Sequence, residues 1–368
     1  MSSLYVGLMS GTSLDGVDAV LADFSAGMAV LSHVHRPFAD ALRSELLSLN
    51  GAGADELHRA ALAGNALAGV YADAVSAVLE DAGVTRAAVR AIGAHGQTVR
   101  HRPGAFDGIG YTIQVLNAAL LAERCDIDVV ADLRSRDVAA GGQGAPLVPA
   151  FHRAQFAQPG RTVAVLNLGG IANLTVLGAD GATLGFDCGS ANALMDHWCR
   201  QHRGQAFDAD GSWAAGGQVH ADLLQAMLAE PFFAAAPPKS TGRDLFNPGW
   251  LAAQLAKAAA APAQDVQATL AELCVRTVAD ALRRHAPQAR ELLVCGGGAH
   301  NRHVMSRLAV CLPGCAVAPT DHRGLPATQV EAVAFAWLAQ AHCAGRCANL
   351  PSVTGARGPR LLGALYPA

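Results

Sequence analysis

Residues 6–21 read VGLMSGTSLDGVDAVL, and residues 165–177 read VLNLGGIANLTVL. In each stretch an apolar strand runs into a turn of glycine and polar residues, and a second apolar strand follows. Two such segments, each opening one half of the chain, predict a duplicated α/β domain. Ligands of proteins built this way usually bind in a cleft, so the two turns are the first candidates for a binding site.

Apolar stretches of strand length alternate with helical segments along the rest of the chain. Further strands are predicted at 89–93, 127–131, 183–186 and 291–295. Helices are predicted within 40–83 and at 191–202, 218–229, 250–261, 266–285, 302–310 and 331–341. This alternation is typical of the α/β class. The Gly/Pro-rich loop AAGGQGAPLVP at 139–149 predicts a domain boundary nearby.

The composition excludes several classes of protein. The 368 residues carry 27 Lys and Arg against 30 Asp and Glu, and the net charge of −3 gives no general attraction for nucleic acid or an anionic membrane. We expect neither a secretory signal nor a transmembrane helix, because no long apolar run is free of charged, polar or proline breaks. Nine cysteines without a Cys-x-x-Cys pair indicate reduced thiols in the cytoplasm. The spacings Cys311/Cys315 and Cys343/Cys347 leave a zinc site open as the alternative to small buried residues.

The first glycine turn, Gly11-Thr12-Ser13-Leu14-Asp15-Gly16-Val17-Asp18, has the composition of a phosphate-binding loop. Consecutive backbone N–H groups and hydroxyls in such a turn suit phosphate oxygens. Asp15 and Asp18 could hold Mg²⁺, directly or through water. The alternative is a hairpin in which Asp and Gly serve only the turn geometry. No GxxxxGK[ST] stretch is present, so a Walker-type loop is excluded.

Two later glycine segments have related features. The turn Leu168–Asn173 of the second half includes Gly169, Gly170 and Asn173, and together with the first turn it could clamp a triphosphate. Cys295–Asn301 places Gly296, Gly297 and Gly298 between a strand and a helix, where backbone can approach a flat nucleoside closely. A Rossmann GxGxxG is excluded, because Asn301 stands where its third glycine would be.

Several polar groups follow predicted strands. Asp187 ends the strand at 183–186 and could act as a general base, the alternative being an N-cap for the next helix. Three polar clusters suit a polyhydroxylated substrate: His95-Gly96-Gln97-Thr98 with His101, Asp132-Leu133-Arg134 with Asp137, and Lys239–Asp244. Arg134 or Arg243 suits an anionic group on it. Each cluster taken alone is more often a solvated loop.

Taken together, the motifs resemble the anhydro-N-acetylmuramic acid kinases. The matching stretches run in order over residues 6–355 and comprise GLMSGTSLDGVDAVL, AHGQTVRH, DLRSRDVAAGGQGAPLVP, LNLGGIANLT, GFDCGSAN, KSTGRDLFN, CGGGAHN, GLPATQVEAVAFAWLA and NLPSVTGA. The resemblance implies the actin/hexokinase/Hsp70-like superfamily. We therefore expect a duplicated actin-like (ribonuclease H-like) ATPase fold, with two lobes and a central cleft. The expected first lobe is 1–135 together with 342–368, and the second is 136–341.

The resemblance also implies a reaction and a set of site residues. ATP and water act on 1,6-anhydro-N-acetylmuramate, the anhydro ring opens, and O6 is phosphorylated to give N-acetylmuramate 6-phosphate and ADP in cell-wall sugar recycling. Asp187 is the implied base. Implied ATP-binding residues are Gly11, Thr12, Ser13, Asp15, Gly16, Asp18, Gly169, Gly170, Asn173, Gly296, Gly297, Gly298 and Asn301, with Mg²⁺ at Asp15 and Asp18. Implied substrate-binding residues are His95, Gln97, Thr98, Arg134, Asp137 and Glu331.

For Glu331, on an otherwise apolar helix, a salt bridge to an arginine is the alternative to sugar hydroxyls. A cytoplasmic homodimer is expected, without nucleic acid or membrane partners.

The chain departs from the family pattern after Asp187. Where the family usually has Thr-Gly-Pro-Gly-Asn, this sequence has Cys188-Gly189-Ser190-Ala191-Asn192, which puts the stiffness of this loop in doubt. Two other functions stay open. One is a kinase of another amino sugar, in which Asp187 deprotonates a hydroxyl; the other is a non-catalytic, ATP-gated clamp.

Overall fold

The chain divides into two compact units in the computed structural model, which describes residues 3–11, 14–242 and 245–368. Unit 1 comprises Met1–Phe151 and Gln329–Ala368, and unit 2 comprises His152–Thr328. These boundaries differ from the predicted ones at 135/136 and 341/342. The second difference arises from helix α13 (Val330–Cys343), which packs on the sheet of unit 1.

Unit 1 is built on a six-stranded sheet of order β13-β7-β4-β1-β2-β3. The first three strands form an antiparallel meander, β4 and β7 run parallel to β1, and β13 closes the edge antiparallel to β7. The bounds are β1 Leu4–Met9, β2 Gly16–Asp23, β3 Ala29–Pro37, β4 Val89–Ala94, β7 Val129–Ala131 and β13 Ala364–Tyr366. Of the first glycine turn predicted at Gly11–Asp18, residues Gly16–Asp18 belong to β2, and Gly11 follows the central strand β1.

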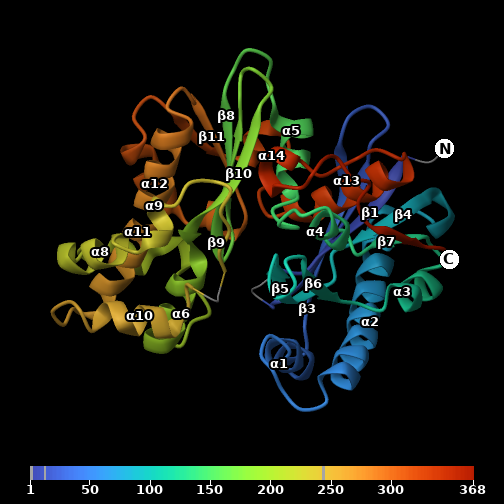
Figure 1. Cartoon of the computed structure of the whole chain (residues 1–368), viewed down its shortest axis with the longest axis horizontal. Helices are drawn as coiled ribbons and strands as arrows, with labels where there is room; N and C mark the ends of the chain where they lie inside the picture. Colours follow the sequence, from blue (N-terminus) through green and yellow to red (C-terminus); the bar gives the residue numbers. More distant parts are fainter. Residues whose placement is uncertain (1–2, 12–13, 243–244) are drawn as a thin grey trace. The chain divides into compact units, whose positions relative to one another are not determined.

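Helices cover both faces of the unit 1 sheet (Figure 1). Alternate residues of β1 point to opposite faces. Val6 and Leu8 join the core beneath α2 (Glu56–Ala82), while Tyr5 joins the core beneath α13. By length and composition, α2 is the one helix among the described residues that could cross a membrane. Because 56% of its most apolar window is buried inside the protein, α2 has the surroundings of a core helix.

Glycines in β1 and β4 allow α13 to approach the sheet closely. A Cβ on Gly7 would lie 1.9 Å from the carbonyl oxygen of Ala332, and a Cβ on Gly93 would lie 2.0 Å from that of Phe335. No side chain fits at such distances. These contacts place residues 330–343 with unit 1.

Unit 2 repeats the strand order of unit 1. Its five-stranded sheet runs β10-β9-β8-β11-β12, again with an antiparallel meander followed by strands parallel to the first one. The bounds are β8 Val163–Leu168, β9 Ile171–Leu177, β10 Thr183–Ser190, β11 Glu291–Cys295 and β12 Ala316–Pro319. In both units the first five strands thus have the order 3-2-1-4-5 of the ribonuclease H-like fold. The predicted duplicated actin-like fold is confirmed.

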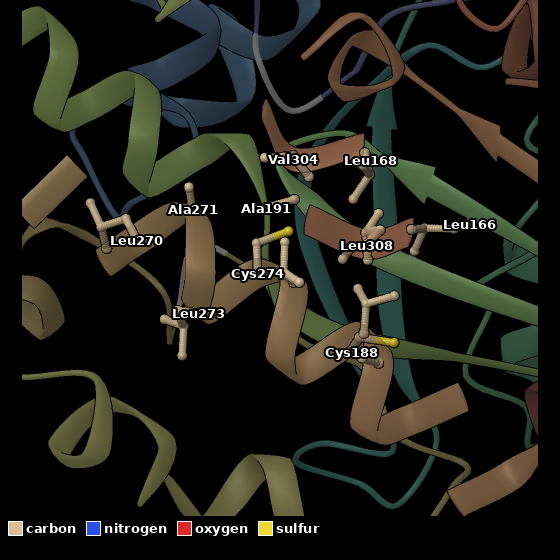
Figure 2. Close-up of a cluster of buried hydrophobic side chains, with 14 of the residues drawn as sticks. Leu166, Leu168, Cys188, Ala191, Leu270, Ala271, Leu273, Cys274, Val304 and Leu308 are labelled. Carbon is tan, nitrogen blue, oxygen red and sulfur yellow. The ribbon is translucent and has the colours of Figure 1, made fainter. Parts of the chain in front are cut away.

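The core of unit 2 lies between the sheet and the long helix α11 (Ala263–His285). Figure 2 shows Leu166 of β8, Cys188 of β10 and Cys274 of α11 among its side chains. Helices α6 (Asn192–Arg203) and α12 (Arg302–Cys311) contribute further apolar residues. This packing holds the end of β8, which leads into the second glycine turn, and the part of β10 that carries Asp187.

The remaining elements complete the two units. Those of unit 1 are α1 Asp40–Ser48, β5 Gln97–Pro103, β6 Gly110–Val115, α3 Ala118–Cys125, α4 Ser135–Ala139 and α14 Pro351–Thr354, and α5 (Val148–Phe156) spans the boundary. Those of unit 2 are α7 Ser212–Ala215, α8 Ala221–Leu228, α9 Pro231–Ala234 and α10 Pro248–Leu255. Short 3-10 helices occupy 86–88 in unit 1 and 209–211, 297–300 and 320–323 in unit 2. The strands β3, β5, β6, β12 and β13 were not predicted from the sequence.

Candidate active site

The first glycine turn is anchored by a side chain from β5. Gln97 is buried, and its Nε2 donates to the carbonyl oxygen of Gly11 at 3.1 Å. At the other end of the turn, a Cβ on Gly16 would lie 2.3 Å from the carbonyl oxygen of Arg36 on β3. Gly16 thus lets β2 and β3 pack closely. The predicted ATP ligands Thr12 and Ser13 lie outside the described residues.

The two acidic residues predicted to serve Mg²⁺ lie at the start of β2. Asp15 is exposed, whereas Asp18 Oδ1 lies 3.0 Å from His33 Nε2 and 3.1 Å from His35 Nδ1, both on β3. Among residues 3–11, 14–242 and 245–368, no group of three or more His, Cys, Asp or Glu side chains is arranged to hold a metal. The Mg²⁺ role of Asp15 and Asp18 stays a prediction.

His95 and Arg134 form a buried pair in unit 1. The imidazole Nδ1 of His95 lies 3.0 Å from the carbonyl oxygen of Ser10, and Arg134 Nε and Nη2 lie 3.2 and 2.9 Å from its Nε2. Burial, aided by the charge of Arg134, lowers the pKa of His95 to about 3. His95 is therefore neutral at physiological pH, and we assign the proton to Nδ1 because a carbonyl accepts there and a guanidinium donates to Nε2.

Arg134 remains the cation of this cluster. Burial lowers its pKa to about 10, and the negative charges of Glu331 and Asp137 oppose that shift. Its Nη1 donates to the carbonyl oxygen of Gly144 at 2.9 Å. Glu331 lies in the first turn of α13. The structure thus brings Glu331 into the electrostatic environment of Arg134, a pairing compatible with either of the two roles considered for Glu331.

Asp137 and Thr98 bond to the protein itself. Asp137 is fully buried and accepts hydrogen bonds from the Gly144 N–H at 2.8 Å, from Asn349 Nδ2 at 2.7 Å and from Thr354 Oγ1 at 2.8 Å. It ties the loop after α4 to the segment around α14. Thr98 Oγ1 accepts from Gln114 Nε2 at 3.1 Å. Their roles in substrate binding stay predictions, and the observed contacts of Asp137 are structural.

Asp187 lies in a row of polar side chains across the unit 2 sheet. Asn167 on β8 pairs with Asn173 on β9, which pairs in turn with Asp187 on β10. Asn173 Nδ2 donates to Asp187 Oδ1 at 2.8 Å, and the Thr241 N–H donates to Oδ2 at 2.8 Å. The predicted ATP ligand Asn173 is therefore in direct contact with the predicted base.

The environment of Asp187 suits a general base. Burial raises the pKa of its carboxyl to about 6, and this rise is opposed by the two hydrogen bonds and by the charge of Lys239. A pKa near the working pH favours proton transfer. The alternative N-cap role is wrong, because helix α6 begins at Asn192 with Ala191 as its N-cap residue.

The second glycine turn packs on the start of α6. The Asn192 N–H donates to the carbonyl oxygen of Gly169 at 3.0 Å, and the N–H groups of Ala191 and Ala193 donate to that of Gly170 at 3.0 and 3.1 Å. The carbonyls of the turn are thus used inside the protein. ATP binding by Gly169 and Gly170 stays a prediction.

The three glycines after β11 differ in their surroundings. A Cβ on Gly296 would lie 2.4 Å from Asn167 Oδ1, and one on Gly298 would lie 2.6 Å from Leu168 Cβ, whereas Gly297 faces open space. Gly296 and Gly298 thus allow this segment to pack against the second glycine turn. Asn301 caps α12, its Oδ1 accepting from the Val304 N–H at 3.0 Å. Nucleotide binding by these residues stays a prediction.

Comparison with known proteins decides the family. Residues 3–368 match the family described as "Anhydro-N-acetylmuramic acid kinase". The chain belongs to the anhydro-N-acetylmuramic acid kinase family. The protein of that name from Albidiferax ferrireducens is 58% identical over 389 residues, covering 100% of both chains. The protein of that name from Bordetella petrii is 61% identical over 371 residues, covering 99% of this chain and 96% of its own.

A solved structure, (R)-2-hydroxyglutaryl-CoA dehydratase component A of Acidaminococcus fermentans, aligns over 91% of this chain and 96% of its own. Its TM-score of 0.48 and 13% identity are too low to support an inference.

In this member of the family, two of the three residues that depart from the usual motif lie in the hydrophobic core. Cys188 and Ala191 are each 2% exposed and pack in the unit 2 core (Figure 2). A Cβ on Gly189 would lie 2.6 Å from the ring of Phe233. Cys188 and Ala191 therefore pack in the core close to Asp187 in the sequence.

Sequence reasoning missed Asn167 as part of the Asp187 row. Its Oδ1 is buried and has no hydrogen-bond partner among the described residues. The available signal was its place two residues before the glycine pair, on the strand that leads into the turn. The contact between Thr241 and Asp187 was also missed, because it joins segments 54 residues apart.

Proposed function

We propose that this chain, as an anhydro-N-acetylmuramic acid kinase, uses ATP and water to convert 1,6-anhydro-N-acetylmuramate into N-acetylmuramate 6-phosphate and ADP. The observation that carries this proposal is Asp187, a carboxylate with a pKa of about 6 and both oxygens hydrogen-bonded. A base of this kind can take a proton from water near neutral pH. Family membership supports the substrate and the reaction.

The proposed reaction has one nucleophilic water and one phosphoryl transfer. Asp187 accepts a proton as the water oxygen bonds to C1 of the sugar, and the bond from C1 to O6 breaks. The released O6 bonds to the γ-phosphorus of ATP, and ADP leaves. Positioning and electrostatic stabilisation together supply most of the catalysis of phosphoryl transfer. Arg134, charged at neutral pH, is the group we propose for the anionic part of the sugar.

Mg²⁺ is part of the proposal. Asp15 is exposed, and the imidazoles of His33 and His35 both contact Oδ1 of Asp18. Carboxylate oxygens suit Mg²⁺, which usually keeps several of its waters, so these two residues would hold it through water. When bound with ATP, the cation neutralises phosphate charge.

Incubation with ATP, Mg²⁺ and 1,6-anhydro-N-acetylmuramate tests the proposal, with product mass as the readout. In H₂¹⁸O, ring opening by water places ¹⁸O at C1, whereas an ordinary hydroxyl acceptor gives a phosphorylated sugar without it. Asp187→Asn should lower turnover by about 10²–10⁴-fold while nucleotide binding stays nearly intact. A variant that keeps more than about a tenth of the activity would exclude Asp187 as the base, and absence of any product would favour an ATP-gated clamp.

We further propose a cytoplasmic homodimer. All nine cysteines are free, which is compatible with a reducing compartment. Sedimentation velocity at micromolar concentration tests the dimer, and a single species of monomer mass would overturn it.

A further inference from the structure

We propose that Asn173 is a positioning residue for Asp187, and that it is not a ligand of the ATP phosphates. Its amide donates to Asp187 Oδ1 at 2.8 Å, so one of the groups that donate to this carboxylate belongs to the neighbouring strand of the sheet. The proposal rests on the proposed function of Asp187 as the base. It assigns to Asn173 a role different from the one implied by the family motif.

The strand register holds the pair together. Asn173 and Asp187 lie directly opposite each other on antiparallel strands, where side chains of paired residues meet on one face. The register shifts between Asp187 and Gly189, immediately after this pair. Such a bulge bends a strand locally, and bulges are frequent beside active sites. The backbone therefore fixes where the Asn173 amide meets the carboxylate.

The second oxygen of Asp187 is held from a different segment. Oδ2 accepts from the Thr241 N–H at 2.8 Å, and the Asp187 N–H donates to the carbonyl oxygen of Lys239 at 3.1 Å. With one donor on each oxygen, rotation of the carboxylate is restricted. Asn173 is the only side chain known to bond to it among the described residues.

The charge of Lys239 acts on Asp187 from a distance. Lys239 Nζ donates to the carbonyl oxygens of Phe232 and Phe233 at 3.0 and 3.3 Å and lies 4.6 Å from the ring centre of Phe232. Its charge lowers the pKa of Asp187 less than the Asn173 hydrogen bond does. A hydrogen bond to the ionised form favours that form, so removal of the Asn173 donor should make Asp187 harder to ionise.

The test measures the titration of Asp187 directly. Carboxyl ¹³C NMR follows the Asp187 resonance, which is assigned by its loss in Asp187→Asn. Asn173→Leu keeps the approximate shape and removes the donor, and it should raise the pKa of Asp187 by about one unit. Asn173→Gln keeps an amide and should lie between this variant and wild type. Asn167→Leu makes the same change one strand away and should leave the titration unmoved.

Kinetics provide the second readout. With the base harder to ionise, kcat of Asn173→Leu should fall about five-fold more at pH 6 than at pH 8.5, while the KM for ATP stays within about two-fold. An unmoved Asp187 titration, or a KM for ATP raised about ten-fold with an unchanged pH profile, would overturn the proposal. If Asn173→Leu fails to fold by circular dichroism, Asn173→Ala carries the same test. The NMR titration does not depend on turnover. Full activity of Asp187→Asn would therefore reject the role of Asp187 as the base without changing the result for the effect of Asn173 on the pKa of Asp187.

Discussion

At the scale of single residues, burial and hydrogen bonding act in opposite directions on Asp187. Burial raises the pKa of its carboxyl to about 6, and the donors from Asn173 and Thr241 keep it from rising further. In the unfolded chain the pKa of an aspartate is about 3.9. Between these two values the unfolded state is ionised while the folded state holds a proton, so folding becomes less favourable as pH rises through this window.

The stability of Asp187→Asn relative to wild type should therefore increase as pH rises. The free energy of unfolding of the variant, relative to wild type, should increase by about 2 kcal/mol between pH 4 and pH 7.5. Urea unfolding at several pH values measures this difference. Asp222→Asn, an exposed acid in unit 2, is the control and should show no such trend. A difference for Asp187→Asn that is constant with pH would contradict the prediction.

The exposed carboxylate of Asp15 allows a second test at this scale. Asp15→Ala should raise the Mg²⁺ and ATP concentrations needed for half-maximal rate by about ten-fold, because charge is removed from beside the proposed metal. The KM for the sugar and the melting temperature should change little. Asp73→Ala, an exposed acid on α2, is the matched control. An effect confined to the sugar KM would place Asp15 elsewhere in the reaction.

At the scale of elements, the contact between α13 and the unit 1 sheet depends on small residues. The backbone of α13 comes so close to β1 and β4 that Gly7 and Gly93 have no room for a methyl group. Overpacking against backbone forces the helix to move. Since α13 carries Glu331 in its first turn, the same contact sets the position of Glu331 relative to Arg134.

Gly93→Ala should lower the free energy of unfolding by about 3 kcal/mol, because the new Cβ would lie 2.0 Å from the carbonyl oxygen of Phe335. Urea unfolding at pH 7.5 measures the loss. Gly51→Ala is the control, since the nearest atom to its Cβ would be 4.0 Å away, and its stability should stay within about 0.5 kcal/mol of wild type. Equal stability of the two variants would show that α13 can shift at little cost.

At the scale of the whole molecule, each unit contains a buried neutral histidine. His95 in unit 1 and His152 in unit 2 both have their pKa lowered to about 3, chiefly by burial. Below the unfolded pKa of about 6.5 the unfolded chain takes up protons that the folded units do not. The stability contributed by each neutral imidazole is complete above that pH and is lost as pH falls towards 3.

Acid should therefore destabilise both units. Removal of one buried histidine should make the free energy of unfolding depend less steeply on pH. Between pH 6 and pH 4 the free energy of unfolding of His152→Gln should fall less steeply than that of wild type. The two slopes should differ by about 1.4 kcal/mol per pH unit. Tryptophan fluorescence during urea unfolding reports mainly on unit 2, which holds Trp198, Trp213 and Trp250. His58→Gln, an exposed histidine, should leave the slope unchanged. An equal slope in His152→Gln and wild type would contradict the prediction.

The sequence by itself determined the duplicated fold, the two glycine turns and most of the central strands. These features depend on local patterns, because the period of apolar residues and the residues required by a tight turn are read within about ten positions. Strand β11, predicted at 291–295, has those bounds in the structure. Edge strands such as β3 were missed, since most of its residues are exposed or half-buried and its apolar pattern is weak.

Only the tertiary structure decided which polar side chains meet. Asn173 bonds to Asp187 because β9 and β10 pair in one register, and a shift by one residue would turn the two side chains to opposite faces. His95 and Arg134 come together across 39 residues, and α13 joins unit 1 through contacts made more than 200 residues away in sequence. Such pairings depend on packing between elements, which no local pattern encodes.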